Sequence, residues 1–361
     1  MLYSLTESVR EKKSDRRFFK NARITPELNR AEDFRHVNFQ PHLLSMKRIT
    51  DMSCTDIIPD IHGQAGKLRF ALHNLGWKRN GTTWLHPEPN REIIFLGDFI
   101  DRGPENAAVI RIVRELMDAG RAKAVMGNHE LNAIHFHTND PDTGAPLRSH
   151  DHHNLGQHQS FLKEFPLGAS HTHDVLQWMR GLPLFIETEC FRAVHAAWIQ
   201  PAIDNLRAQT KVGVLSHDQF IRAGRKGDEL HDLAEEVVKG PEASLPLPHS
   251  FIDKGNKMRR HVRIKWWNGK ALTWREVAMS VPDITKLPDE PLPENLLMTI
   301  YPIEDKPVFF GHYWLSGEPE LQCHNALCLD YSAGTDGPLV TYAAGENCAN
   351  LCPTNIRVHS E

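Results

Sequence analysis

The chain has 361 residues, of which 40% are hydrophobic and 24% are charged, and its formal net charge is −4. This length allows one large folded core or two smaller ones. The slightly negative charge gives no support for nucleic-acid binding, and no apolar run approaches the roughly 20 residues that a membrane helix needs.

Residues 1–50 are predicted to be a poorly ordered extension that precedes the folded part. They are rich in basic residues and lack sustained hydrophobic periodicity. Their acidic residues do not fit a transit peptide, and a secretory apolar segment is not evident. We therefore expect a cytoplasmic protein that does not bind a membrane.

An alternation of strands and helices begins near residue 55. The pattern predicts strands at Thr55–Pro59, Ile93–Leu96 and Ala122–Met126, and helices around Leu68–Leu75 and at Ala107–Leu116. Two strand–helix units in tandem indicate a parallel sheet covered by helices, which is an α/β arrangement.

The next segment, from His129 to His173, is polar and contains nine histidines. It is predicted to be a long loop with a short helix around Gln159–Phe165, and its histidines are interpreted mainly as solvated side chains. A hairpin formed by Leu184–Glu187 and Phe191–His195 follows.

Residues 200–300 mix glycine, proline and charge, and they are predicted to form an inserted cap that contains a strand at Val262–Trp267. Further strands are expected at Val308–Phe310, Ala326–Asp330 and Leu339–Tyr342. The predicted domain spans residues 51–346 and is followed by a C-terminal tail, residues 347–361.

Four short motifs stand where predicted strands end. They are Asp60-Ile61-His62-Gly63, the run from Gly97 to Gly103, Gly127-Asn128-His129-Glu130, and Gly311-His312. Polar residues at the carboxyl ends of strands in an open α/β sheet converge on one site. Such a mixture of Asp, His and Asn suits Mn, Fe, Zn or Co better than Ca.

This ligand set is large enough for two adjacent divalent ions. Asp98 is the natural bridge, because other candidate ligands precede and follow it in the chain. Asp60 and His62 would complete one site, and Asn128, His195 and His312 the other. Two ions that share a water molecule lower its pKa and yield a hydroxide nucleophile, with manganese expected to be effective in vitro.

Three further residues complete the predicted chemistry. His129 is a candidate for protonating the leaving oxygen, and Asp101 could orient it and raise its pKa. The planar guanidinium of Arg102 suits phosphate oxygens. The sequence therefore predicts metal-assisted hydrolysis of a phosphate ester.

These motifs resemble those of the calcineurin-like metallophosphoesterase superfamily, in particular its phosphoprotein-phosphatase branch. The resemblance covers roughly residues 54–345 and extends to symmetric diadenosine tetraphosphatases, through segments such as Phe310-Gly311-His312-Tyr313-Trp314. It implies a central β-sandwich of mixed sheets flanked by helices. It also implies the same six metal ligands, the phosphate-binding Arg102 and the acid pair formed by His129 and Asp101.

The sequence departs from the family pattern in places that affect the substrate. Ala196-Ala197-Trp198 follows His195 where the family usually has a glycine, and the second phosphate-binding arginine of protein phosphatases has no clear counterpart. Arg259, Arg260 and Arg263 in the cap are candidates for substrate binding.

Several functions remain open at this point. The first is hydrolysis of a phosphorylated small molecule or nucleotide polyphosphate by a metal-bound hydroxide. An alternative is a Ser/Thr phosphoprotein phosphatase, and an alternative of another class is a metal-binding scaffold without catalysis. A nucleic-acid substrate is not expected, because no basic stripe supports one.

Overall fold

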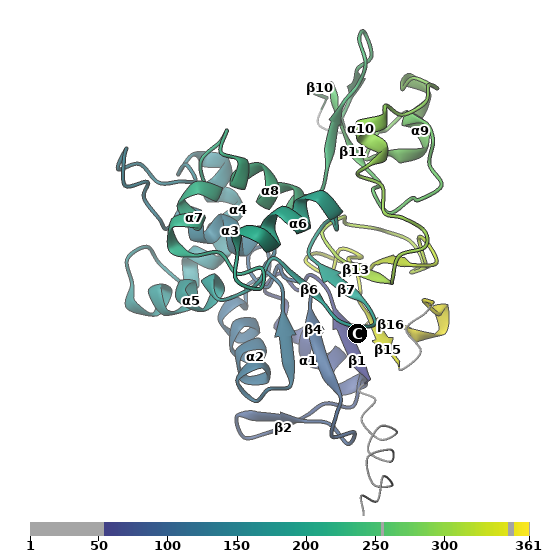
Figure 1. Ribbon diagram of the computed structural model, residues 1–361. Helices are drawn as coiled ribbons and strands as arrows, with labels where there is room; N and C mark the ends of the chain where they lie inside the picture. Colours follow the sequence, from purple (N-terminus) through teal and green to yellow (C-terminus); the bar gives the residue numbers. More distant parts are fainter. Residues whose placement is uncertain (1–53, 254–255, 346–349, 361) are drawn as a thin grey trace, which may run out of the picture. The chain divides into compact units, whose positions relative to one another are not determined.

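The computed structural model describes residues 54–253, 256–345 and 350–360 (Figure 1). The predicted extension, residues 1–50, lies outside the described residues. The helices are α1 (Ala65–Asn74), α2 (Asn106–Asp118), α3 (Asn128–Phe136), α4 (His152–Glu164), α5 (Ser170–Arg180), α6 (Gln200–Gln209), α7 (His217–Ala223), α8 (Glu229–Lys239), α9 (Trp274–Val277) and α10 (Glu294–Leu297).

Two mixed sheets form the centre of the fold. The first has the order β16 (Ile356–His359), β15 (Leu339–Ala344), β1 (Thr55–Ile58), β4 (Glu92–Phe95) and β5 (Ala122–Ala124). The second has the order β14 (Ala326–Cys328), β13 (Val308–Phe310), β7 (Arg192–Val194) and β6 (Phe185–Glu187). Strands β1, β4 and β5 run parallel, whereas β15 is antiparallel to both β1 and β16.

A continuous apolar cluster joins the two sheets. Ile57 and Ile94 of the first sheet, neighbours in the parallel register, share this cluster with Phe309 and Leu327 of the second. All four side chains are at most 2% exposed. The predicted β-sandwich is therefore confirmed, with residues from both sheets burying their apolar faces against one another.

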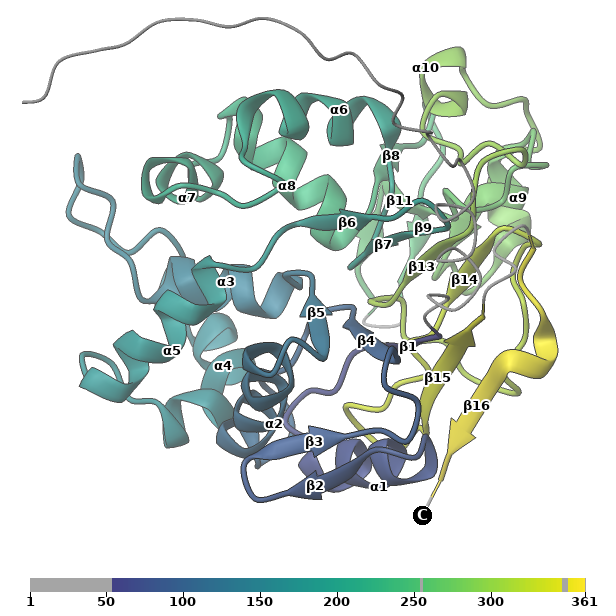
Figure 2. The same ribbon diagram turned by 60° about the horizontal axis from the view of Figure 1, so that its bottom comes forward.

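Helices cover the other face of the first sheet. Helix α1 buries Leu68 and Leu72, and α2 buries Val109 and Val113. These residues belong to the same apolar cluster as Ile58 and Phe95 of the sheet. Figure 2 shows α1, α2 and the hairpin of β2 (Lys78–Asn80) and β3 (Thr83–Leu85) on this side. The strand–helix alternation predicted from residue 55 is thus present.

The prediction of a long loop between residues 129 and 173 is wrong, because α3, α4 and the start of α5 lie there. Helix α3 is buried on nearly every side, so its sequence lacks the amphipathic periodicity that would have revealed it. The interpretation of the histidines as solvated is also wrong for His135 and His158, which are 6% and 5% exposed.

Residues 200–300, predicted to be a cap, begin with α6, α7 and α8. A three-stranded sheet of β8 (Glu242–Ser244), β11 (His261–Ile264) and β12 (Ala278–Met279) follows, together with the pair β9 (Phe251–Ile252) and β10 (Met258–Arg259). Trp266 is fully buried, and its indole N–H donates to the Ala196 carbonyl oxygen at 3.0 Å. This contact ties the segment to the loop that follows β7.

The last part of the chain, predicted to be a tail, contributes β16 to the first sheet. Its register pairs Val358 with Val340 of β15. Among the described helices, none combines the length and apolar character required to cross a membrane.

Candidate active site

The six predicted metal ligands lie together at the ends of strands. Asp60 and His62 follow β1, Asp98 follows β4, Asn128 begins α3 after β5, His195 follows β7, and His312 follows β13. All six are buried, with exposed fractions between 0% and 8%. The convergence predicted from the strand ends is therefore present in the structure.

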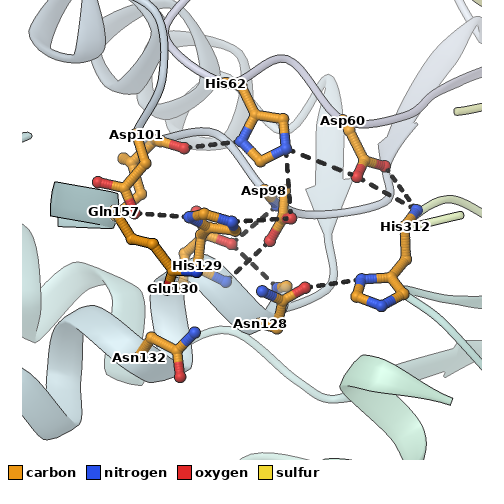
Figure 3. A network of polar contacts seen from close by, with 12 residues as sticks. Asp60, His62, Asp98, Asp101, Asn128, His129, Glu130, Asn132, Gln157 and His312 are labelled. Carbon is orange, nitrogen blue, oxygen red and sulfur yellow. Dashed lines mark hydrogen bonds and ion pairs between the residues drawn. The ribbon is translucent and has the colours of Figure 1, made fainter. Parts of the chain in front are cut away.

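Asp98 lies at the centre of this cluster, as Figure 3 shows. Its Oδ2 atom is 3.5 Å from His62 Nε2 and 3.4 Å from His195 Nε2. On one side, His62 Nε2 is also 3.9 Å from Asp60 Oδ2. On the other, Asn128 Oδ1 is 3.1 Å from His195 Nε2 and 2.8 Å from His312 Nδ1.

The tautomer of His62 is fixed by its environment. Its Nδ1 lies 2.9 Å from the Ile100 carbonyl oxygen, which can only accept a hydrogen bond, so Nδ1 carries the proton. Burial lowers the pKa of His62 to about 3, so the ring is neutral. Its Nε2 lone pair thus faces the oxygens of Asp60 and Asp98, and this buried atom has no hydrogen-bond partner among the described residues.

The lone pair of a ring nitrogen and the oxygens of a carboxylate repel one another when no proton lies between them. A cation bound between the nitrogen and the oxygens removes this repulsion. His195 is held in a similar way, because its Nδ1 lies 2.7 Å from the Leu96 carbonyl oxygen and its Nε2 faces Asp98 and Asn128. Burial lowers the pKa of His195, but the charges of Asp98 and Asp60 outweigh it and raise this pKa to about 10. Backbone carbonyls that hold one ring nitrogen and leave the other for a metal are usual around bound ions. The donor set therefore fits divalent metal ions.

Two overlapping groups of candidate metal ligands share Asp98. One consists of His62, Asp98 and His129, and the other of Asp98, His195 and His312; within each group the ligand atoms lie within 4.8 Å of one another. His129 is the weaker member, since its Nε2 is 4.0 Å from Asp98 Oδ2 while its Nδ1 is held elsewhere.

Glu130 holds the backbone that carries Asp98. Asp98 has a left-handed backbone with φ of 51°, which is uncommon for a residue other than glycine. The Glu130 carboxylate accepts hydrogen bonds from the amides of Asp98, Phe99 and Gly127 at 2.8, 2.9 and 3.0 Å. The sequence analysis assigned no role to Glu130. Its place in the Gly-Asn-His-Glu motif could have indicated one, because the motif also contains a predicted ligand and the predicted proton donor.

The glycine before His312 is required by the carboxylate of Asp60. A Cβ atom at Gly311 would lie 1.9 Å from Asp60 Oδ1. We expect Gly311→Ala to displace this carboxylate and reduce bound metal, as measured by elemental analysis of the purified protein. Gly156→Ala in α4 is the control, since its added Cβ has no atom within 4 Å; equal metal contents in the two variants would contradict the placement of Asp60.

His129 and Asp101 form a close pair beside the cluster. The Nδ1–H group of His129 donates to Asp101 Oδ2 at 2.6 Å, which leaves Nε2 on the side of Asp98. Burial lowers the pKa of His129, but the charge of Asp98 and the hydrogen bond to Asp101 outweigh it and raise this pKa. These effects favour the protonated ring, in which Nε2 also carries a proton.

Arg102 lies at the mouth of the cluster. Its guanidinium stacks on Trp314 at 3.7 Å from the ring centroid, and no described carboxylate lies within ion-pair distance of it. Arg102 and His129 line a cavity of about 290 Å³ together with Gln157 and Lys163 of α4. An unpaired, stacked arginine beside the His129–Asp101 pair suits a phosphate group.

The three arginines predicted in the cap differ in their surroundings. Arg259 donates to Asp253 at 2.7 Å and is 53% exposed, and Arg260 is also exposed. Arg263 lies on β11, 3.8 Å from Glu242. Burial, then the charge of His195 and then the charge of Arg263 lower the pKa of His312. Arg263 is therefore the member of the trio whose charge reaches the cluster.

A family model described as calcineurin-like phosphoesterase matches residues 55–235, which is half of the chain. The chain belongs to the calcineurin-like phosphoesterase family. The matched segment contains Asp60, His62, Asp98, Asn128 and His195, whereas His312 lies beyond it.

Bis(5'-nucleosyl)-tetraphosphatases from other organisms are similar to this chain over shorter stretches. The asymmetrical bis(5'-nucleosyl)-tetraphosphatase PrpE of Oceanobacillus iheyensis is 40% identical over 74 residues, which are 20% of this chain and 29% of the relative. The symmetrical bis(5'-nucleosyl)-tetraphosphatase of Ralstonia nicotianae is 32% identical over 107 residues, 30% of this chain and 33% of the relative. The matches thus span about a third of these relatives' lengths.

A solved structure of a protein serine/threonine phosphatase from Saccharomyces cerevisiae also matches this calcineurin-like phosphoesterase. The identity is 13%, the TM-score is 0.43, and the match covers 86% of this chain and 80% of the other.

Proposed function

We propose that this protein is a dinuclear-metal phosphoesterase that hydrolyses a phosphate ester or nucleotide polyphosphate. The observation that carries the proposal is the buried, neutral His62, whose unpartnered Nε2 faces Asp60 and Asp98. Asp60 and His62 would hold one ion, Asn128, His195 and His312 the other, and Asp98 would bridge them. When bound, two such ions activate a water molecule as the nucleophile and neutralise phosphate charge.

The remaining steps belong to side chains around the cluster. Arg102 would bind the oxygens of the phosphoryl group in the cavity that it lines with His129, beside the proposed metal ligands. His129 donates its Nε2 proton to the departing oxygen, and Asp101 stabilises the orientation of the ring. The filled positions for ligands, acid and arginine argue against the alternative of an inactive scaffold.

Two substrate classes are supported by different observations. Nucleotide polyphosphates are favoured by the names of the relatives. A phosphoprotein is favoured by a cleft of about 1110 Å³ whose walls include α8, β8 and Arg263. Five carboxylates line it, against Lys239 and Arg263, and they would repel an anionic nucleotide: Glu229, Asp232, Glu235, Glu236 and Glu242.

A substrate panel with manganese-loaded protein tests the proposal. We expect hydrolysis of p-nitrophenyl phosphate, and higher kcat/KM for either diadenosine tetraphosphate or a basic phosphopeptide. The preferred substrate identifies the class. No hydrolysis of any of the three, with metal bound and the protein folded, would contradict the proposed function.

Arg263 provides a prediction about substrate choice. A charge-assisted hydrogen bond contributes about 1.5–3 kcal/mol, so Arg263→Ala should raise KM for diadenosine tetraphosphate roughly tenfold, and more than KM for p-nitrophenyl phosphate. Arg259→Ala is the matched control, since Asp253 pairs with that side chain at 2.7 Å, whereas the contact of Arg263 with Glu242 is longer, at 3.8 Å. If the two variants show the same KM values, Arg263 does not bind the nucleotide and the phosphoprotein class gains.

A further inference from the structure

Asp101 is shared between two histidines. One carboxylate oxygen accepts from His129 Nδ1 at 2.6 Å, and the other accepts from His158 Nδ1 at 2.8 Å. His158 lies in α4, 57 residues from Asp101 in the chain. A carboxylate can only accept, so both Nδ1 atoms carry protons.

The position of His158 is well defined by its neighbours. The ring is 5% exposed and stacks on Phe161 with a centroid distance of 4.8 Å and an interplanar angle of 21°. Its Nε2 lies 3.3 Å from His137 Nε2, at the end of α3. One face and both nitrogens of His158 are therefore engaged by contacts.

Helix α4 is itself anchored to the loop that carries Asp101. The Glu164 carboxylate accepts hydrogen bonds from the backbone amides of Asn106 and Ala107 at 2.7 and 3.0 Å, and from the Asn106 side chain at 2.8 Å. The oxygen of that same Asn106 side chain accepts from the Asp101 amide at 2.7 Å. Helix α4 thus holds Asp101 both through its backbone and through its carboxylate.

Asp101 needs this support because its backbone is strained. Its φ is 70°, in the left-handed region that a residue other than glycine seldom adopts. With one oxygen fixed by His158, the carboxylate plane cannot rotate, and the second oxygen stays aligned with His129 Nδ1. Loss of that restraint would allow the imidazole of His129 to turn away from the departing oxygen, and misalignment of a proton donor lowers the rate.

We infer that His158 is a positioning residue for acid catalysis, acting on His129 through Asp101. This inference rests on the proposed phosphoesterase function. His158 does not touch the phosphoryl group in this arrangement; it fixes the carboxylate that orients the proton donor. The His129–Asp101 pair is thereby extended to three side chains drawn from the loop after β4, helix α3 and helix α4.

The test compares two buried histidines of the same segment. His158→Phe removes the donor to Asp101, whereas His135→Phe removes a buried histidine that donates to the Phe220 carbonyl oxygen. The substrates are phenyl phosphate, whose leaving group needs a proton, and p-nitrophenyl phosphate, whose leaving group needs it less. His158→Asn retains an amide N–H near the position of Nδ1 and serves as the conservative variant.

We expect His158→Phe to lower kcat for phenyl phosphate roughly tenfold or more, a part of the roughly 10²–10⁴-fold effect of general acid catalysis. The loss should be smaller for p-nitrophenyl phosphate, KM should change little, and His158→Asn should restore most of kcat. In a His129→Asn background, His158→Phe should have no further effect, because the residue it acts through is gone.

Three results would overturn the inference. The first is an equal loss of kcat on the two substrates in His158→Phe, and the second is the same loss when His129→Asn is already present. The third is the same pattern of losses in His135→Phe. If His158→Phe does not fold, His158→Gln replaces it, since its amide lies too far from Asp101 to act as Nδ1 does.

A measurement that does not depend on enzymatic activity tests this inference separately from the proposed function. In metal-free protein, nuclear magnetic resonance of the ring N–H protons should show that His158→Phe shifts the His129 Nδ1–H signal and that His135→Phe does not. An unchanged signal in His158→Phe would overturn the inference even if the phosphoesterase activity is established. Absence of activity in the parent, with the signal shifted as expected, would contradict the proposed function alone.

Discussion

Asp98→Asn should abolish the paired metal site and nearly all activity. The Oδ2 atom of Asp98 is the oxygen that lies within 3.5 Å of both His62 Nε2 and His195 Nε2. An amide removes the negative charge that two cations would share. Because Lewis-acid stabilisation contributes several kcal/mol and each 1.36 kcal/mol is tenfold in rate, hydrolysis of p-nitrophenyl phosphate should fall roughly 10³-fold.

Elemental analysis of the same variant separates loss of metal from loss of fold. We expect fewer than two bound equivalents, with an unchanged circular dichroism spectrum. Asp56→Asn provides a buried control, because that carboxylate pairs with Arg91 and Trp77 and is not among the proposed ligands. Parent-like activity in Asp98→Asn, or equal metal loss in Asp56→Asn, would contradict the assignment of Asp98 as the bridge.

The second large effect is expected for His129→Asn. His129 Nε2 lies toward the cluster and its Nδ1 is fixed by Asp101, so the ring is oriented to deliver a proton. Turnover of phenyl phosphate should fall roughly 10²–10⁴-fold while both metals stay bound. For p-nitrophenyl phosphate the loss should be smaller, because p-nitrophenolate departs with less protonation.

Equal losses on the two substrates would assign His129 a structural or phosphate-binding role. Arg102→Lys distinguishes this outcome. It keeps the positive charge but removes the planar donor, so it should raise KM for both substrates to a similar extent. If the loss of activity on substitution depends on the leaving group, the residue acts as a proton donor. If the loss is the same for both leaving groups, the residue binds the phosphate or supports the fold.

The candidate ligands could be predicted from the sequence because each one is local to a strand end. Asp60, Asp98 and Asn128 follow short apolar runs, and parallel strands bring their carboxyl ends to one edge. Gly97 and Gly127 beside them marked the tight turns. The β-sandwich came from the family resemblance, whereas the parallel strand–helix units followed from hydrophobic periodicity alone.

The region around α3 and α4 could not be predicted in the same way. Helix α3 packs on nearly every side, so its buried polar residues hide the helical period. His158 was one of nine histidines of similar appearance, and its partner Asp101 is 57 residues away. Two features of the sequence could have indicated α4. Asp151 is a typical N-cap residue, and its side chain accepts from the Asn154 amide at 2.9 Å. His158 and Phe161 are three residues apart, which is the spacing of one helix face, and both are buried.

The cap shows a second limit of prediction from sequence. Arg259, Arg260 and Arg263 are close in sequence, but Asp253 pairs with the first at 2.7 Å. The last lies 3.8 Å from Glu242, and its charge acts on His312. Composition cannot distinguish them, because the distinction depends on which strand each residue joins. Charge clusters in an inserted segment therefore predict function less well than motifs at strand ends.

The dinuclear site is tested most directly by titrating metal-free protein with manganese. Hydrolysis of p-nitrophenyl phosphate is measured after each addition. Activity should remain low through the first equivalent per chain and reach its plateau at two, with the binding isotherm giving the same stoichiometry. A plateau at one equivalent, or full activity in protein from which metal has been removed, would contradict the account.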